Sequence, residues 1–284
     1  MSGAQAQMLA GGRLHLSHGP IDLVIGAEGD AEGDKGAREA AFDAARACFD
    51  GLLEALVAEL TALRRPLDGT VFRGPVARRM AGAVAPHRGF VTPMAAVAGA
   101  VADEVLAAMC AAAPLARAYV NNGGDIALHL APGATYLAAM AASGAQALGQ
   151  VEVTADSPVR GIASSGRAGR SLSLGIADSV TVLAADGARA DVAATLIANA
   201  VDLPGHAAIT RRPARDLQPD SDLGARLVVT ARGALRPSEV ARALERGARR
   251  AQQMQARGLI HGAALFLDNQ ARVVSARNRE VAHA

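Results

Sequence analysis

Aromatic residues are scarce in this sequence of 284 residues: they make up 2% of the chain, and tryptophan is absent. A hydrophobic core must therefore be assembled from alanine, valine, leucine and isoleucine. Hydrophobic residues still make up 51% of the chain and charged residues 20%, which is ordinary for a globular protein and argues against disorder. The length suits one large domain or two fused ones.

Lysine is almost absent, because Lys35 is the only lysine among 29 lysine and arginine residues. A mechanism that needs a lysine therefore has one candidate, and Lys35 lies in a polar, glycine-rich stretch. The formal net charge is only +2. Such a small excess gives no support to nucleic-acid binding, so we expect no nucleic-acid partner.

Cysteine is also rare, and the two cysteines, Cys48 and Cys110, make no disulfide framework. Their spacing does not match a metal site either. Both fall on apolar faces of predicted helices, so we interpret them as small buried hydrophobic residues.

A long uninterrupted hydrophobic run is missing. The first residues show no charged segment followed by an apolar one, as a signal peptide requires. The alanine-rich stretch 93–114 comes closest to a membrane span, but Asp103 and Glu104 interrupt its centre, where charge is costly. We therefore expect a cytoplasmic protein with no membrane partner.

Apolar residues at three- and four-residue spacing predict a helix over 37–64, which Pro66 ends. A second helix is predicted over 93–113, with Thr92 as its N-cap and Pro93 at its first position. Its small residues permit close packing within the subunit or across a dimer, so a homo-oligomer stays open. Two more helices are predicted, at 188–201 and 237–257.

Short segments of alternating polar and apolar residues predict strands between these helices. Because hairpins and helices mix without a regular βαβ alternation, we expect an α+β fold with mixed or antiparallel sheets packed with helices. The tract 28–36 is predicted as a loop. The segments are a hairpin at 12–27 and strands at 117–122, 126–131, 135–140, 150–155, 160–165, 177–185, 226–230 and 259–267.

The chain contains no clear linker, so we expect a single domain over 1–284. Within it we distinguish three parts: an N-terminal hairpin and long helix (1–66), a core that carries the polar motifs (85–205), and a C-terminal helix and strand (226–275).

The first polar motif contains Asn122, Gly123, Gly124 and Asp125. The two glycines permit positive φ and allow a ligand to lie against bare backbone. Asn122 and Asp125 could then bind a polar ligand. The same residues are equally typical of a plain hairpin turn, and the two interpretations stay open.

The second motif is a strand that runs into a loop rich in glycine, serine and arginine. Hydroxyl, N–H and guanidinium groups in such a loop suit a phosphate or a carboxylate, although a flexible polar loop is the alternative. The candidate binding residues are Ser164, Ser165, Gly166, Arg167, Arg170 and Ser171.

The third motif places Asp191, Thr195 and Asn199 on one face of a predicted helix, at i, i+4 and i+8. A carboxylate and a hydroxyl supply the oxygen ligands that suit a hard cation such as Mg²⁺. Asp191 and Thr195 are therefore candidate metal ligands. The alternative is that Asp191 caps the helix while the other two side chains face solvent.

The order of these motifs resembles the ApbE-like superfamily of FAD:protein FMN transferases. That superfamily carries an Asn-x-Gly-Gly-Asp-Ile turn, a strand ending in Ala-Thr-Ser-Gly and a helix start of Ala-Asp-Ala-x-Ala-Thr-Ala. The matching segments here are 121–126, 163–166 and 190–195, and an upstream Gly-Gly-Ile-Ala-Lys-Gly-x-x-x-Asp motif is similar to 94–103. The resemblance covers about residues 85–205 and implies an ApbE-like fold.

The resemblance also implies a cofactor site. By carry-over, Asp191 and Thr195 would bind Mg²⁺ together with the Val97 carbonyl, and the metal would position FAD for cleavage of its pyrophosphate. Two departures bear on the reaction. Ala98 stands where the family has a lysine, and the loop 167–173 stands where it has a histidine.

The chain is similar to the cytoplasmic branch of the superfamily, which shares segments like 92–99 and 169–171. That branch occurs among methanogens and methylotrophs, which suggests a role near pterin-linked one-carbon metabolism. His87 precedes the motif helix at 93–113 and is a candidate general base.

Three functions follow as hypotheses. The first is an enzyme that acts on a phosphorylated flavin- or pterin-like small molecule with Mg²⁺, using Asp191 and His87 as catalytic residues. The second is a non-catalytic cofactor-binding or carrier protein, which the missing lysine and histidine motivate. The third is a genuine FAD:protein FMN transferase.

Overall fold

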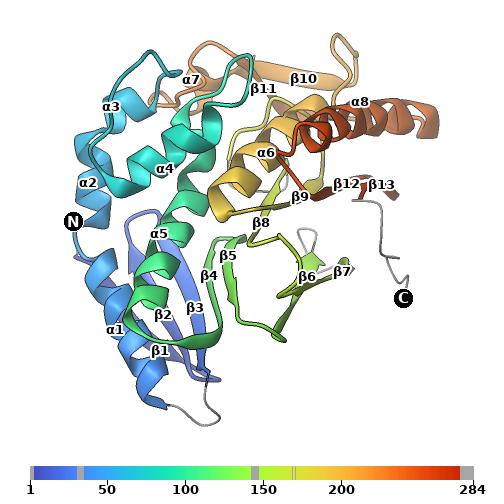
Figure 1. Cartoon of the computed structure of the whole chain (residues 1–284). Coiled ribbons are helices and arrows are strands. Elements are labelled where there is room, and N and C mark those ends of the chain that lie inside the picture. Colours follow the sequence, from blue (N-terminus) through green and yellow to red (C-terminus); the bar gives the residue numbers. More distant parts are fainter. Residues whose placement is uncertain (1–2, 31–34, 142–146, 168, 170, 276–284) are drawn as a thin grey trace. The chain divides into compact units, whose positions relative to one another are not determined.

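The computed structural model describes residues 3–30, 35–141, 147–167, 169 and 171–275 (Figure 1). The chain divides into two compact units. The first unit comprises Met1–Ala138, Glu152–Ala163 and Ala185–Asp191, and the second comprises Ala139–Val151, Ser164–Ala184 and Val192–Ala284. The expectation of a single domain stays a prediction.

An antiparallel sheet forms one layer of the first unit, with its strands in the order β1-β2-β3-β4-β5-β8. Alternate residues of β2 and β3 are buried, as expected when one face of a sheet packs against a core. The strands are β1 (Gln5–Leu9), β2 (Arg13–His18), β3 (Ile21–Gly29), β4 (Leu115–Asn122), β5 (Asp125–Leu130) and β8 (Gly161–Ser165).

Helices pack against one face of this sheet. α1 lies against β3, α5 lies along β4 and β5, and the two helices contact each other (Figure 1). The helices are α1 (Lys35–Phe49), α2 (Leu52–Ala58), α3 (Leu60–Leu63), α4 (Pro75–Val84), the 3-10 turn η1 (Pro93–Ala96) and α5 (Val97–Ala112).

Backbone contacts join α5 to the chain segment that starts helix α6 (Gly187–Ala200). A Cβ atom added to Gly99 would lie 2.2 Å from the Gly187 carbonyl oxygen, and one added to Gly161 would lie 2.0 Å from the Asp186 carbonyl oxygen. Segment 186–187 therefore fits between two backbones that only glycine permits to come so close.

In the second unit, strands β9, β12 and β13 pair antiparallel in that order, and β10 and β11 form a two-stranded sheet. Its longest helix, α8, buries one side on β12 and β13. These elements are β9 (Ser179–Ala184), β10 (Ile209–Pro213), α7 (Ala214–Leu217), β11 (Leu227–Arg232), α8 (Pro237–Ala256), β12 (Gly262–Leu267) and β13 (Gln270–Val274). Strands β6 (Thr135–Ala141) and β7 (Ala147–Thr154) form a further two-stranded sheet.

The α+β class with antiparallel sheets is confirmed. The single helix expected over 37–64 is wrong, because Gly51 adopts a left-handed φ of 74° and separates α1 from α2. The loop expected at 28–36 is wrong at its two ends, since β3 reaches Gly29 and α1 begins at Lys35; residues 31–34 lie outside the described residues. Thr92 makes no side-chain cap, and a 3-10 turn precedes α5.

Two further expectations concern α5 and the cysteines. By length and composition, the stretch Pro93–Ala112 could cross a membrane, but half of its apolar window is buried in the protein, as in a core helix. A cytoplasmic location stays a prediction. Cys48 and Cys110 carry free thiols and are half-buried rather than buried, and burial raises the pKa of both thiols.

The close approach of the Gly99 and Gly187 backbones allows a prediction about stability. Gly99→Ala should lower the free energy of unfolding by about 2–3 kcal/mol, because its methyl group would overlap the Gly187 backbone. Urea denaturation measures this loss. Gly82→Ala is the matched control in helix α4, where the added methyl meets no atom within 4 Å and should raise stability by about 0.5–1 kcal/mol. A Gly99→Ala variant as stable as Gly82→Ala would contradict the packing described here.

Candidate functional site

Asp191 projects from the first turns of α6 toward the start of α5. Its Oδ2 accepts a hydrogen bond of 3.1 Å from the Gly99 N–H, and the Ala98 backbone also hydrogen-bonds the carboxylate. These amides belong to the first turn of α5, where N–H groups have no partner within their own helix. Asp191 therefore caps α5, rather than its own helix as the sequence alternative held.

The electrostatic environment of Asp191 opposes its negative charge. Burial raises the pKa of this carboxyl well above its ordinary value, and the nearby charges of Asp125 and Asp103 raise it further. The hydrogen bonds from Gly99 and Ala98 act in the opposite direction but do not compensate. A bound cation would favour the ionised carboxylate by neutralising this cluster.

Asp103 performs the reciprocal role from α5. Its two carboxylate oxygens accept hydrogen bonds of 2.8 Å each from the Gly187 and Ala188 N–H groups, at the start of α6. Asp103 is only 9% exposed, and burial is the main reason that its pKa rises to about 6. Sequence reasoning treated Asp103 only as an interruption of an apolar stretch; its place at the end of the 94–103 motif was the available signal.

The first motif forms the hairpin turn between β4 and β5. Gly123 and Gly124 have φ values of 64° and 112°, which only glycine adopts easily, and Asn122 pairs with Asp125 across the turn. The buried Asn122 side chain donates a 3.1 Å hydrogen bond to the Ala98 carbonyl at the start of α5. The turn interpretation is confirmed, and ligand binding by these four residues stays a prediction.

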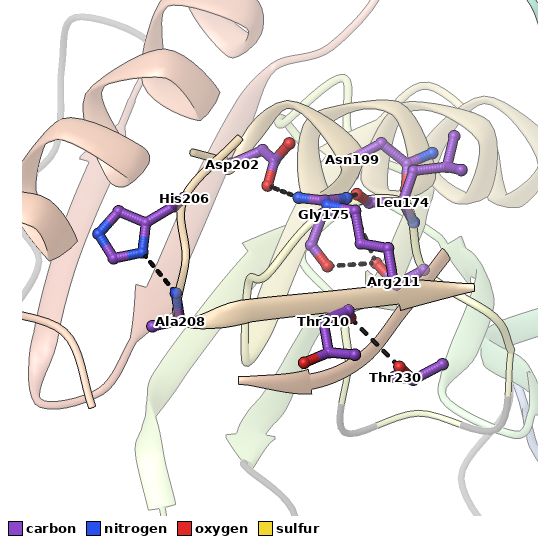
Figure 2. Close-up of polar contacts among 10 residues, drawn as sticks. Leu174, Gly175, Asn199, Asp202, His206, Ala208, Thr210, Arg211 and Thr230 are labelled. Atoms are coloured by element: carbon purple, nitrogen blue, oxygen red, sulfur yellow. Dashed lines mark hydrogen bonds and ion pairs between the residues drawn. The ribbon is translucent and has the colours of Figure 1, made fainter. Parts of the chain in front are cut away.

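The polar row on α6 has several different roles. Thr195 follows Asp191 by one helical turn and is half-buried. Asn199 accepts a hydrogen bond of 3.0 Å from the Leu174 N–H, so it fixes a neighbouring loop (Figure 2). Asp191 and Thr195 remain the candidate cation ligands of this row.

The second motif belongs to the second unit. The Ser164 hydroxyl lies 2.9 Å from the Thr181 hydroxyl, and the Arg167 N–H donates to the Ala177 carbonyl. The Gly169 N–H donates to the Gly166 carbonyl. The backbone N–H of the candidate residue Arg167 and that of its neighbour Gly169 are therefore already used within the protein.

For the remaining residues of this motif, binding of a phosphate or a carboxylate stays a prediction. Arg167 and Ser171 are exposed and Ser165 is half-buried. Arg170 lies outside the described residues. His87 is half-buried in the turn after α4, where its backbone N–H donates to the Val84 carbonyl, and its role as a general base likewise stays a prediction.

The donor set around Asp191 can be tested for its fit to a metal. Within the described part of the chain, no three His, Cys, Asp or Glu side chains converge on one point that could hold an ion. A soft or borderline metal such as zinc, which takes several side-chain ligands, therefore does not fit. Mg²⁺ binds through one or two carboxylates and keeps several waters, so Asp191, the Thr195 hydroxyl and a main-chain carbonyl suit it better.

The raised pKa of Asp103 makes a prediction about stability and pH. A carboxyl whose pKa is higher in the folded than in the unfolded protein contributes stability at low pH and loses it as pH rises through the folded value. Between pH 7 and pH 5, the wild-type protein in EDTA should therefore gain about 1 kcal/mol relative to Asp103→Asn. Urea denaturation at the two pH values measures the difference. If the free energy of unfolding changed equally in the two proteins between pH 7 and pH 5, the raised pKa of Asp103 would be contradicted.

Comparisons with known proteins support the resemblance to the ApbE-like superfamily. The family model described as AbpE bacteria matches residues 6–273. Two curated relatives, each named UPF0280 protein, come from Methanothrix thermoacetophila (38% identical over 128 residues, 45% of this chain and 52% of the relative) and Methanosphaerula palustris (44% over 135 residues, 45% and 54%). The chain thus spans about half the length of the curated relatives it matches.

Two solved structures are similar at low identity. One is the ApbE protein of Thermotoga maritima, with 13% identity, coverage of 88% of this chain and 77% of that chain, and a TM-score of 0.38. The other is the apo form of the Pseudomonas stutzeri flavinyl transferase ApbE, with 14% identity, coverage of 96% and 94%, and a TM-score of 0.41. Because the family model matches residues 6–273, which is nearly the whole chain, the chain belongs to the family described as AbpE bacteria and, with it, to the ApbE-like superfamily.

Proposed function

We propose that this protein binds Mg²⁺ through Asp191 and Thr195 and acts on a phosphorylated flavin- or pterin-like molecule. The observation that carries the proposal is the position of Asp191, a half-buried carboxylate that caps α5 and whose pKa is raised by burial and by the charges of Asp125 and Asp103. Carboxyl groups with strongly perturbed pKa values cluster at functional sites, and a bound cation would offset the negative charge gathered here. Membership of the ApbE-like superfamily supports the choice of a cofactor-like substrate.

The chain's own residues would hold and orient the reacting groups. The Gly99 N–H fixes Oδ2 of Asp191, so the other carboxylate oxygen can face a cation. Asp103 fixes the start of α6 and with it the direction of the Asp191 side chain. Bound Mg²⁺ would supply Lewis-acid polarisation of a phosphoryl oxygen. The turn at Gly123 and Gly124 offers bare backbone against which a planar ring could lie.

A specific feature favours a second candidate, a cofactor-binding protein without turnover. Ala98 stands where the superfamily has a lysine, and its backbone carbonyl already accepts the Asn122 hydrogen bond. The Ala98 side chain can neither transfer a proton nor stabilise negative charge on a phosphoryl group. Cation and cofactor binding would then persist without a reaction.

The Asp191→Asn variant tests the cation site. An Asn side chain still accepts the Gly99 hydrogen bond, so the cap on α5 is kept while the negative charge is lost. Thermal unfolding should show that millimolar Mg²⁺ raises the Tm of the wild-type protein but not that of the variant. In EDTA the variant should be at least as stable as the wild-type protein, because an unfavourable buried charge is gone.

Asp156→Asn is the matched control for this experiment. It removes the same charge from an exposed turn of the first unit and should leave the Mg²⁺ effect intact. An equal Mg²⁺ response in wild-type and Asp191→Asn proteins would exclude Asp191 as a ligand.

The reaction itself is tested by incubating the protein with FAD and Mg²⁺, and separately with a phosphorylated pterin. We expect release of a mononucleotide or transfer to a protein acceptor at a rate that falls at least tenfold in Asp191→Asn, since removal of one charge-stabilising group commonly has such an effect. Mass spectrometry of the products measures it. Tight binding without any product would select the carrier function, and inertness toward both ligands would remove flavins and pterins from the proposal.

A further inference from the structure

The second unit contains a cavity of about 880 Å³ that the cation site does not use. Its walls are the loop at 203–206, the exposed face of α8 and Arg272 from β13. This volume lies in the range of pockets that hold small organic ligands. Three separate chain segments thus converge on one cavity within a single unit.

Positive charge dominates these walls. Arg242, Arg246 and Arg249 lie at i, i+4 and i+7 of α8, so they share one face of the helix, and Arg272 joins them from the sheet. The acidic residue among the lining residues is Glu245, which pairs with Arg249 at 3.5 Å. Four guanidinium groups therefore face one carboxylate.

Three of these arginines have no carboxylate partner within the described residues, namely Arg242, Arg246 and Arg272. Like charges three or four residues apart on a helix repel each other and destabilise it. The spacing of Arg242, Arg246 and Arg249 repeats this unfavourable arrangement. An anion placed between them would convert the repulsion into attraction.

The loop that forms the opposite wall is held in place before any ligand arrives (Figure 2). Asp202 at its start binds the Arg211 guanidinium, which also donates to the Leu174 carbonyl. His206 Nδ1 accepts a hydrogen bond of 3.2 Å from the Ala208 N–H, and its Nε2 lies 3.2 Å from Glu239 Oε1 on α8. Since Nδ1 accepts, Nε2 carries the proton, and the ring has no further N–H for a ligand.

The chemistry of the walls defines the ligand. Guanidinium groups bind phosphate oxygens through paired hydrogen bonds, and Arg242 to Arg249 extends over about 10 Å of helix, which suits more than one anionic group. Leu203, Pro204 and Ala241 add an apolar portion to the wall. A single inorganic phosphate would use only part of this surface.

We propose that the cavity beside α8 is a binding site for a small organic molecule with two or more phosphate groups, such as a nucleoside diphosphate. The site lies wholly within the second unit and does not depend on Asp191. Its guanidinium groups bind the phosphates and its loop wall packs against the organic part. The prearranged loop reduces the entropy that binding must overcome.

The test measures ADP binding by isothermal titration calorimetry at 150 mM salt in EDTA, with inorganic phosphate as a second probe. ADP should bind, and inorganic phosphate should bind at least about tenfold more weakly because it engages fewer arginines. The double variant Arg242→Ala/Arg246→Ala should lose at least about tenfold in ADP affinity.

The matched control is Arg212→Ala/Arg215→Ala, which removes the same charge from exposed positions of the second unit outside the cavity. Its ADP affinity should stay within about twofold of the wild-type value, since distant exposed charges are screened at this salt. If both double variants lost the same ADP affinity, the loss would come from net charge rather than from the cavity, and the proposal would be overturned.

Asp191→Asn separates this inference from the proposed cation site. Its ADP affinity in EDTA should equal that of the wild-type protein, whatever its response to Mg²⁺. Loss of ADP binding in Asp191→Asn with retention in Arg242→Ala/Arg246→Ala would assign ADP to the other site and overturn the proposal. Absence of ADP binding to the wild-type protein would do the same.

Discussion

The reciprocal capping of α5 and α6 is the interaction on which the first unit depends. Asp103 of α5 accepts the first N–H groups of α6, and Asp191 of α6 accepts an N–H of the first turn of α5. This exchange requires the two helix starts to touch, which glycine at positions 99 and 187 permits. Helix N-termini favour negative charge, so each carboxylate also interacts with a helix dipole of suitable sign.

The same arrangement gathers more negative charge than the helices alone can stabilise. Burial raises the pKa of both Asp103 and Asp191 in spite of their hydrogen bonds. Neighbouring carboxylates raise it further, Asp186 for Asp103 and both Asp125 and Asp103 for Asp191. Ionisation of these carboxyl groups at neutral pH therefore lowers the free energy of unfolding of the protein without a bound cation. Such a conflict between stability and charge placement is typical of functional sites. Asp191 rather than Asp103 is the proposed ligand, because both carboxylate oxygens of Asp103 already accept hydrogen bonds.

Patterns in the sequence predicted correctly those elements whose structure depends on residues close together in the chain. The Asn-Gly-Gly-Asp turn follows from glycine's access to positive φ, and the strands around it follow from alternation. The length of α1 was wrong because Gly51 ends a pattern whose apolar spacing continues beyond it. The role of Asp103 was missed because its partners lie 84 and 85 positions away, and no periodicity reports a contact of that kind. The short helix α4 was not predicted, because Arg78 and Arg79 interrupt the run of apolar residues that it buries.

In the proposed cation site, Mg²⁺ binds the ionised carboxylate of Asp191, whose pKa is raised by burial and by the charges of Asp125 and Asp103. Isothermal titration calorimetry of Mg²⁺ binding at mildly acidic pH, repeated in buffers of different ionisation enthalpy, counts the protons released. We expect the wild-type protein to release protons on binding and to bind Mg²⁺ more weakly as pH falls, and Asp191→Asn to do neither. Mg²⁺ binding by the wild-type protein without proton release, or with the same release in Asp191→Asn, would contradict it.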